Sequence, residues 1–121
     1  MKQSRPIYLD LLHISQPLPA IISLLHRISG VLLFLFIPIL LAILQSSLAG
    51  AESFKALQSS PWLRLTGFIL LAAFAYHCYA GLRFLMLDLH WGTALKSARI
   101  SAWMVLIAAM LSFLMLGIWL W

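Results

Sequence analysis

The sequence predicts an all-α integral membrane protein with three transmembrane helices. Of its 121 residues, 64% are apolar and only 9% are charged, and the mean hydropathy is +1.03. Soluble domains carry about 25% charged residues, so this composition excludes a soluble enzyme, a disordered segment and a disulfide scaffold. Three stretches lack Lys, Arg, Asp and Glu, at 28–44, 65–82 and 100–121. Each approaches or exceeds the length of about 20 residues that a membrane span requires.

Flanking turns extend these stretches to three predicted helices, over 18–46, 61–89 and 97–121. Pro61 suits the first turn of its helix, where a missing N–H loses no partner. Pro38, in contrast, lies in mid-span and predicts a kink. A short polar linker at 46–60 and a shorter loop at 90–96 join the helices. We therefore expect a single membrane-anchor domain over 1–121, with no room for an extramembranous domain.

Basic residues set the expected orientation. The side of the membrane with the first linker, at 46–60, holds only Lys55 and Arg64. The N-terminal side and the second loop hold the other six, which are Lys2, Arg5, Arg27, Arg83, Lys96 and Arg99. Because cytoplasmic loops carry the excess of Lys and Arg, we predict a cytoplasmic N-terminus and a periplasmic C-terminus. The net charge of +5 then indicates attraction to anionic membrane lipid, and nucleic acid is not expected as a partner.

A polar stripe interrupts the start of the first helix, in the segment S-L-L-H-R-I-S-G at 23–30. Ser23, His26, Arg27 and Gly30 follow the helical spacing i, i+3, i+4, i+7, so they share one face. That face could hold an anionic group or a carbonyl oxygen at the edge of the hydrocarbon. The alternative is that Arg27 extends to lipid phosphate and His26 only marks the interface.

A second polar cluster lies on the second helix, where His77 is well inside the bilayer. Gly81, Phe84 and Asp88 follow on the His77 face. An imidazole can ligate a metal, and a glycine one turn away lets a flat macrocycle approach the backbone. A hydrogen bond from His77 to a neighbouring helix explains the spacing equally well. The chain has no C-x-x-C-H motif, so any haem would be held non-covalently.

The two clusters lie at compatible depths. His26, Arg27 and Arg83 all fall within a few turns of the cytoplasmic face, and His77 is somewhat deeper. This arrangement suits a haem whose iron is deep and whose propionates point to cationic residues, although Arg83 falls about 120° from the His77 face. The third helix has no ionisable residue over 100–121. Its small and polar residues predict helix packing, and they are Ser101, Ser112 and Gly117.

These motifs belong to a pattern that resembles the cytochrome b subunits of bacterial succinate dehydrogenase nearly end to end. The pattern begins with R-P at 5–6, L-D-L at 9–11 and Pro17. It continues with the motif at 23–30, and it ends with H-x-x-x-G-x-R at 77–83 and then Asp88. Many members of that family carry a second histidine directly after this arginine, where the present chain has Phe84.

The resemblance implies a complex of several subunits in a bacterial inner (plasma) membrane. A flavoprotein subunit oxidises succinate, an iron–sulfur subunit passes the electrons on, and two small anchors deliver them to ubiquinone. This chain would form half of a heterodimeric haem-binding helix bundle. His77 would be one axial ligand of the haem b iron, and the partner anchor would supply the other.

The resemblance also implies roles for the remaining polar residues. Ser23 and Arg27 would form part of the quinone site, with Ser23 bonded to a quinone carbonyl. His26 and Arg27 would lie near the haem propionates, Gly81 would leave room for the haem, and Arg83 is a further candidate contact. Asp88 is a candidate for the polar route that brings protons to the quinone.

Three alternatives remain open at this point. The complex could work mainly as a fumarate reductase, because nothing in the chain fixes the direction of electron flow. The chain could be a purely structural anchor that binds no haem. It could also be a small proton or ion conductor that uses His77 and Asp88.

Overall fold

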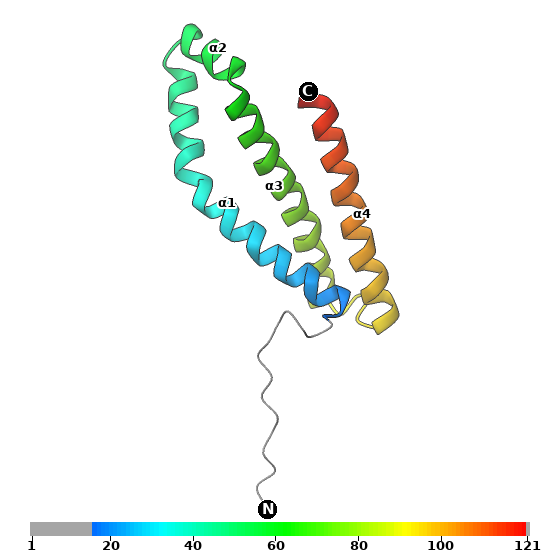
Figure 1. Cartoon of the computed structure of the whole chain (residues 1–121). Coiled ribbons are helices and arrows are strands. Elements are labelled where there is room, and N and C mark those ends of the chain that lie inside the picture. Colours follow the sequence, from blue (N-terminus) through cyan, green and yellow to red (C-terminus); the bar gives the residue numbers. More distant parts are fainter. Residues whose placement is uncertain (1–15, 121) are drawn as a thin grey trace, which may run out of the picture.

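The computed structural model describes residues 16–120 and consists of helices joined by short connections (Figure 1). The helices are α1 (Leu18–Leu48), α2 (Ala51–Ser59), α3 (Pro61–Asp88) and α4 (Leu95–Leu120). Three of them, α1, α3 and α4, are long and apolar enough to cross a membrane. The predicted all-α fold with three transmembrane helices is therefore confirmed. The basic residues Lys2 and Arg5, the motif segments at 5–6 and 9–11, and Trp121 lie outside the described residues.

The ends of the three long helices agree with the sequence signals to within about two residues. Pro61 occupies the first turn of α3, as expected. At the other end of α3 the chain reverses through His90 and Gly92, whose φ angles are 64° and 74°. The His90 N–H donates to the Leu87 carbonyl at 2.9 Å, and the Trp91 N–H donates to the Met86 carbonyl at 2.9 Å. This left-handed cap satisfies carbonyls that the helix end would otherwise leave unpaired.

The short helix α2 was not predicted, because the linker at 46–60 gave only a polar signal. Nine residues of this linker form one continuous helix after Gly50. Glu52 lies in its first turn, where a negative charge is favourable next to the partial positive charge of a helix N-terminus. A helix of this length has too few apolar residues to show the periodicity on which the prediction of the long helices depends.

Helix α3 contacts both α1 and α4, and its small residues determine how closely they pack. Ile22, Ala80, Ala102 and Val105, drawn from the three helices, form the buried cluster. Alanines at such crossings let the helix backbones approach each other. Most of the large apolar side chains outside this cluster are exposed on the chain, as expected for helices that face lipid tails and other subunits.

Polar contacts tie the three long helices together. The Tyr76 hydroxyl donates to the Ile22 carbonyl at 3.0 Å and so joins α3 to α1. The Tyr79 and Ser112 hydroxyls lie 2.8 Å apart and join α3 to α4. Gly117 of α4 packs against the Phe68 ring. The packing function predicted for Ser112 and Gly117 therefore agrees with the contacts they make.

Helix α1 bends in its middle, and this bend determines where it meets α3. Figure 1 shows the first half of α1 lying obliquely against α3, with a change of direction in the cyan part of the helix. Pro38 lies in the interior of α1, and proline removes one backbone hydrogen bond and kinks the helix that contains it. The closest contacts of α1 with α3 consequently lie in the half of α1 that carries His26.

Candidate functional site

The candidate site is a crossing of α1 and α3 at which two histidines and two glycines face each other. A Cβ atom at Gly30 of α1 would lie 3.0 Å from Cε1 of His77 on α3. A Cβ atom at Gly81 of α3 would lie 3.4 Å from Nε2 of His26 on α1. Each histidine therefore occupies the space that the glycine of the opposite helix leaves empty. The two imidazole rings stack, with centroids 4.1 Å apart and planes inclined by 14°.

The orientation of the His77 ring is fixed by two polar groups of α1. Its Nδ1 lies 3.2 Å from the His26 carbonyl oxygen and 3.0 Å from Oγ of Ser29. The Ser29 hydroxyl donates to that same carbonyl at 2.8 Å. A carbonyl can only accept, and the one hydroxyl proton of Ser29 is used in its bond to that carbonyl, so the tautomer that satisfies both contacts is the one with the proton on Nδ1 of His77. In the neutral ring the lone pair then lies on Nε2.

This arrangement leaves Nε2 of His77 free for a ligand. Among residues 16–120, the buried side-chain nitrogens and oxygens without a hydrogen-bond partner are His26 Nε2 and Arg83 Nη1. His77 Nε2 also makes no hydrogen bond to another of these residues. A histidine with an anchored Nδ1–H and an open Nε2 is the usual form of a metal-ligating histidine. The residues present therefore fit the haem that the sequence predicts.

His26 presents a different chemical situation in the same crossing. Its Nε2 is buried and has no hydrogen-bond partner in the described part of the chain. A buried polar atom without a partner is rare and costs about 1–3 kcal/mol. The ring is held by stacking on His77 and by a tilted contact with Phe84, whose centroid is 5.2 Å away. A polar group from a ligand or another subunit would give His26 Nε2 the hydrogen-bond partner that it lacks.

Besides Arg83, three of the predicted site residues lie outside the histidine crossing. Ser23 is half-buried on α1, and the neighbouring Arg27 is exposed. Asp88 is exposed at the last residue of α3. Within the described residues, none of the three is hydrogen-bonded to His26 or His77. The predicted stripe at 23–30 is thus divided: His26 and Gly30 face α3, whereas Arg27 stays at the surface.

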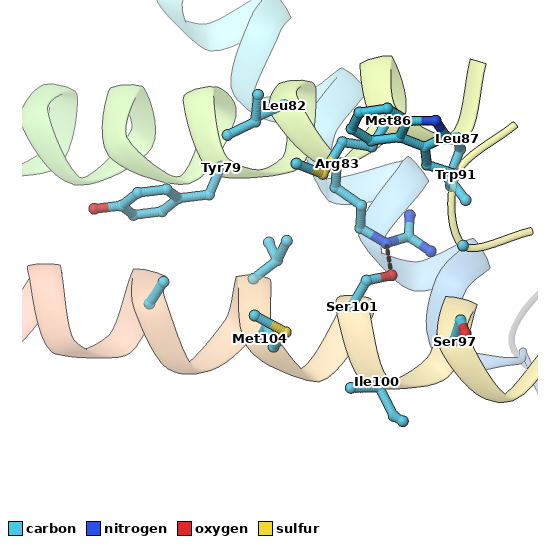
Figure 2. A pocket seen from close by; sticks show the side chains of 13 residues that line it. Tyr79, Leu82, Arg83, Met86, Leu87, Trp91, Ser97, Ile100, Ser101 and Met104 are labelled. Atoms are coloured by element: carbon cyan, nitrogen blue, oxygen red, sulfur yellow. Dashed lines mark hydrogen bonds between the residues drawn. The ribbon is translucent and has the colours of Figure 1, made fainter. Parts of the chain in front are cut away.

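Arg83 is buried, with 5% of its surface exposed, and it contacts α4. Its Nε donates to the Ser101 hydroxyl at 3.0 Å, and its Nη2 donates to the Ala98 carbonyl at 3.1 Å. Figure 2 shows this side chain reaching from α3 across to Ser101. Its Cζ lies 5.3 Å from the centroid of the Phe84 ring, which also contacts His26. The guanidinium therefore approaches the histidines through Phe84 and makes no hydrogen bond to them.

The sequence gave no separate reason to single out Ser29 and Ser101. Ser29 was noted only as part of the motif at 23–30, and Ser101 only as a small packing residue. Ser29 lies three residues after His26, and this spacing is the available signal, because a serine there can bond the His26 carbonyl of the preceding turn. The partners of both serines lie on another helix, so their roles depend on the register between helices.

Comparison with known proteins places these features in a family. The family described as "Succinate dehydrogenase/Fumarate reductase transmembrane subunit" matches residues 1–116. The chain is also 37% identical, over 100% of both chains, to the succinate dehydrogenase cytochrome b556 subunit of Coxiella burnetii (strain RSA 493 / Nine Mile phase I). Both matches include the histidine crossing.

The contact between Gly30 and His77 generates a prediction about stability. We expect Gly30→Ala to destabilise the protein by about 1–3 kcal/mol, as overpacking of a close contact does. The His77 ring cannot yield to the new methyl group without weakening its bonds to Ser29 and the His26 carbonyl. The thermal unfolding midpoint of the purified, membrane-extracted protein measures this effect.

Gly67→Ala is the matched control, because a Cβ atom there would meet nothing within 4 Å. Both substitutions gain the higher helix propensity of alanine, so the difference between them isolates the contact with His77. Equal midpoints for the two variants would contradict the close packing of α1 on α3.

Proposed function

Because the chain belongs to the succinate dehydrogenase/fumarate reductase transmembrane subunit family, we propose that it binds haem b and helps to form a ubiquinone-reduction site. It is a membrane-anchor cytochrome b subunit of this oxidoreductase family. The single observation that carries the proposal is the His77 ring, whose Nδ1–H is anchored by α1 and whose Nε2 is open. When bound, the haem supplies an iron that accepts and releases one electron at a time.

His77 is proposed as one axial ligand of that haem. The stacked rings of His26 and His77, with centroids 4.1 Å apart, leave no space between them for a group that both could hold. His26 therefore cannot be the second ligand in this arrangement. We assign the second ligand to the partner anchor, so that the complete site forms only between two membrane subunits and this chain contributes half of the bundle.

His26 and Arg27 are proposed to contact the propionates. The buried Nε2 of His26 needs a hydrogen-bond partner, and a propionate oxygen could accept from it when that nitrogen carries the proton. Gly81, which was expected to leave room for the haem, is proposed to contribute indirectly: the His26 ring occupies the space beside it, so the missing side chain lets that ring lie close to α3. Arg83 remains a predicted contact, although its guanidinium bonds α4.

Ser23 and Arg27 are proposed to bind the quinone. They lie one turn apart on α1, and Arg27 is exposed, so a headgroup can reach them from the lipid at the edge of the hydrocarbon. Quinone reduction takes two electrons and two protons, and a hydroxyl and a guanidinium can stabilise the charge that develops on the carbonyl oxygens. Asp88, exposed near the cytoplasmic end of α3, is proposed for the route that delivers the protons.

The proposed setting is a bacterial inner membrane with a cytoplasmic N-terminus and a periplasmic C-terminus. The partners are a second small anchor, an iron–sulfur subunit and a flavoprotein subunit. The whole chain, over 1–121, is proposed to act as one membrane-anchor domain. The side on which α1 begins and the α3–α4 loop lies would then face the soluble subunits, because electrons from the cytoplasm must enter close to the histidine crossing.

The assignment of His77 predicts a change in the visible spectrum. We expect His77→Ala to abolish or shift the reduced α-band of the b-type haem in the purified complex, because the iron loses one axial ligand. The control is His90→Asn, in the α3–α4 loop, since asparagine tolerates the positive φ of that position. An unchanged spectrum in His77→Ala would show that this histidine is not a ligand.

The hydrogen bond between Ser29 and His77 predicts a change in haem potential. We expect Ser29→Ala to keep the haem and to raise its midpoint potential by about 20–40 mV, which corresponds to about 0.5–1 kcal/mol. The loss of one acceptor makes the ligating imidazole a weaker electron donor to the iron. Redox titration of the purified complex measures the shift.

Ser47→Ala is the matched control for Ser29. Ser47 lies on the same helix and makes the same bond to the carbonyl three residues earlier, at 2.7 Å from Leu44 O, but it is exposed and distant in sequence from the site. A midpoint potential that is the same in both variants would contradict a positioning role for Ser29.

The exposed position of Arg27 predicts a selective loss of quinone reduction. We expect Arg27→Ala to lower succinate:quinone activity by about 10²-fold, the order expected for removal of a charge-stabilising donor. Succinate oxidation with an artificial acceptor should persist, because that reaction occurs in another subunit. Arg99→Ala removes a comparable exposed cation and should leave both activities intact. Unchanged succinate:quinone activity in Arg27→Ala would refute the quinone-site role, whereas equal loss of both activities would indicate failed assembly.

A further inference from the structure

A cavity of about 480 Å³ lies between α3 and α4 and is separate from the histidine crossing. Figure 2 shows its lining side chains, which come from α3, from the loop and from α4. Most of the wall is apolar. The residues that line it include Leu82, Arg83, Met86, Trp91, Ser101 and Met104. The apolar walls and the buried cation together restrict what can occupy the cavity.

The cation is Arg83, which lacks a counter-charge in the described part of the chain. Protein acceptors satisfy its Nε and Nη2, but Nη1 is buried without a partner. The acidic residues of the described region are Glu52 and Asp88, and neither forms an ion pair with Arg83. Burying an unpaired charge is costly in a medium of low dielectric constant. An anion in the cavity would reduce this cost and offer acceptors to the guanidinium.

The depth of Arg83 identifies the kind of anion. Arg83 lies five residues before the end of α3, which corresponds to about 7.5 Å along the helix axis. Trp91 in the loop, also part of the cavity wall, is the residue type that marks the boundary between hydrocarbon and headgroups. The exposed Lys96 and Arg99 lie at the same end of α4. The charged wall of the cavity is therefore at the level of lipid headgroups.

We propose that this cavity binds one anionic phospholipid, with the phosphate next to Arg83 and an acyl chain along Leu82, Met86 and Met104. Basic pockets between transmembrane helices on the cytoplasmic side are typical sites for anionic lipid headgroups. The apolar walls favour a lipid over free phosphate, because the acyl chain fills the cavity and a free ion would lose its hydration there. Arg83 is the charged residue of the wall, and no acidic residue lines it. The wall therefore favours a headgroup with a net negative charge over a zwitterionic one.

Native mass spectrometry of the intact complex tests the proposal. The complex is reconstituted in nanodiscs of phosphatidylcholine and phosphatidylglycerol, extracted in mild detergent, and examined for retained lipid. The wild type should keep one more phosphatidylglycerol per copy of this chain than Arg83→Gln, whose affinity should fall by about tenfold with the loss of the charge. Arg99→Gln, which removes an exposed cation outside the cavity, should retain the lipid.

A second variant separates lipid loss from misfolding. Ala108→Phe lines the same cavity with a larger side chain and leaves the bonds of Arg83 to α4 in place. It should also lose the phosphatidylglycerol, while its haem spectrum and subunit composition stay those of the wild type. Retention of the lipid in Ala108→Phe would place the lipid outside the cavity and overturn the proposal.

Other outcomes would also overturn the assignment. Equal retention of phosphatidylglycerol by the wild type and Arg83→Gln would show that the guanidinium does not bind it. Retention of phosphatidylcholine in place of phosphatidylglycerol would show that only the apolar walls contribute. Displacement of the lipid by millimolar inorganic phosphate would assign the cavity to a free anion. Loss of the haem spectrum in Arg83→Gln with an unchanged lipid count would assign Arg83 to the haem instead.

Discussion

The reciprocal contact of two histidines with two glycines determines how α1 and α3 pack, and much of the remaining structure depends on it. At Gly30 and Gly81 the missing side chains let the helices approach until each imidazole lies against the opposite backbone. Small residues at helix crossings are the general means of close packing in membranes, where lipid provides no hydrophobic force between helices. Here the same residues also bring polar rings together. Helix packing and the placement of the candidate redox ligand therefore have one cause.

The close approach also explains how a polar ring is satisfied inside the hydrocarbon. A helix carbonyl has two lone pairs, of which the helix itself uses one. At His26 the second is open to another donor, because Gly30, one turn later, has no side chain to cover it. Nδ1 of His77 and the Ser29 hydroxyl share this lone pair, at 3.2 and 2.8 Å from the oxygen. The result is a histidine whose Nδ1 is bound by backbone and serine, and whose Nε2 makes no hydrogen bond within the described residues.

Periodicity, charge and proline position were sufficient to predict the three long helices, because a membrane span leaves a strong signal of length and hydropathy. The same signals missed α2, because its nine residues mix polar and apolar types and are too few to show periodicity. The motifs identified the two histidines and the two glycines, His26, His77, Gly30 and Gly81. They did not predict how these residues pair, because neither motif contains information on the register between α1 and α3. Ser29 and Ser101 were missed as functional residues for the same reason. Each acquires its role from an atom on another helix, His77 Nδ1 in one case and Arg83 Nε in the other.

The arginines illustrate how tertiary structure separates residues that a one-dimensional pattern groups together. Arg27 and Arg83 both belong to the cytoplasmic side by charge counting, and both flank a histidine motif. Arg27 is exposed on α1, whereas Arg83 is drawn into the contact of α3 with α4 by the Ser101 hydroxyl and the Ala98 carbonyl. Helix α4 has no ionisable residue over 100–120. It nevertheless contributes to the placement of a charge. By bonding Arg83 it holds the guanidinium against α4, where it makes no hydrogen bond to His26 or His77.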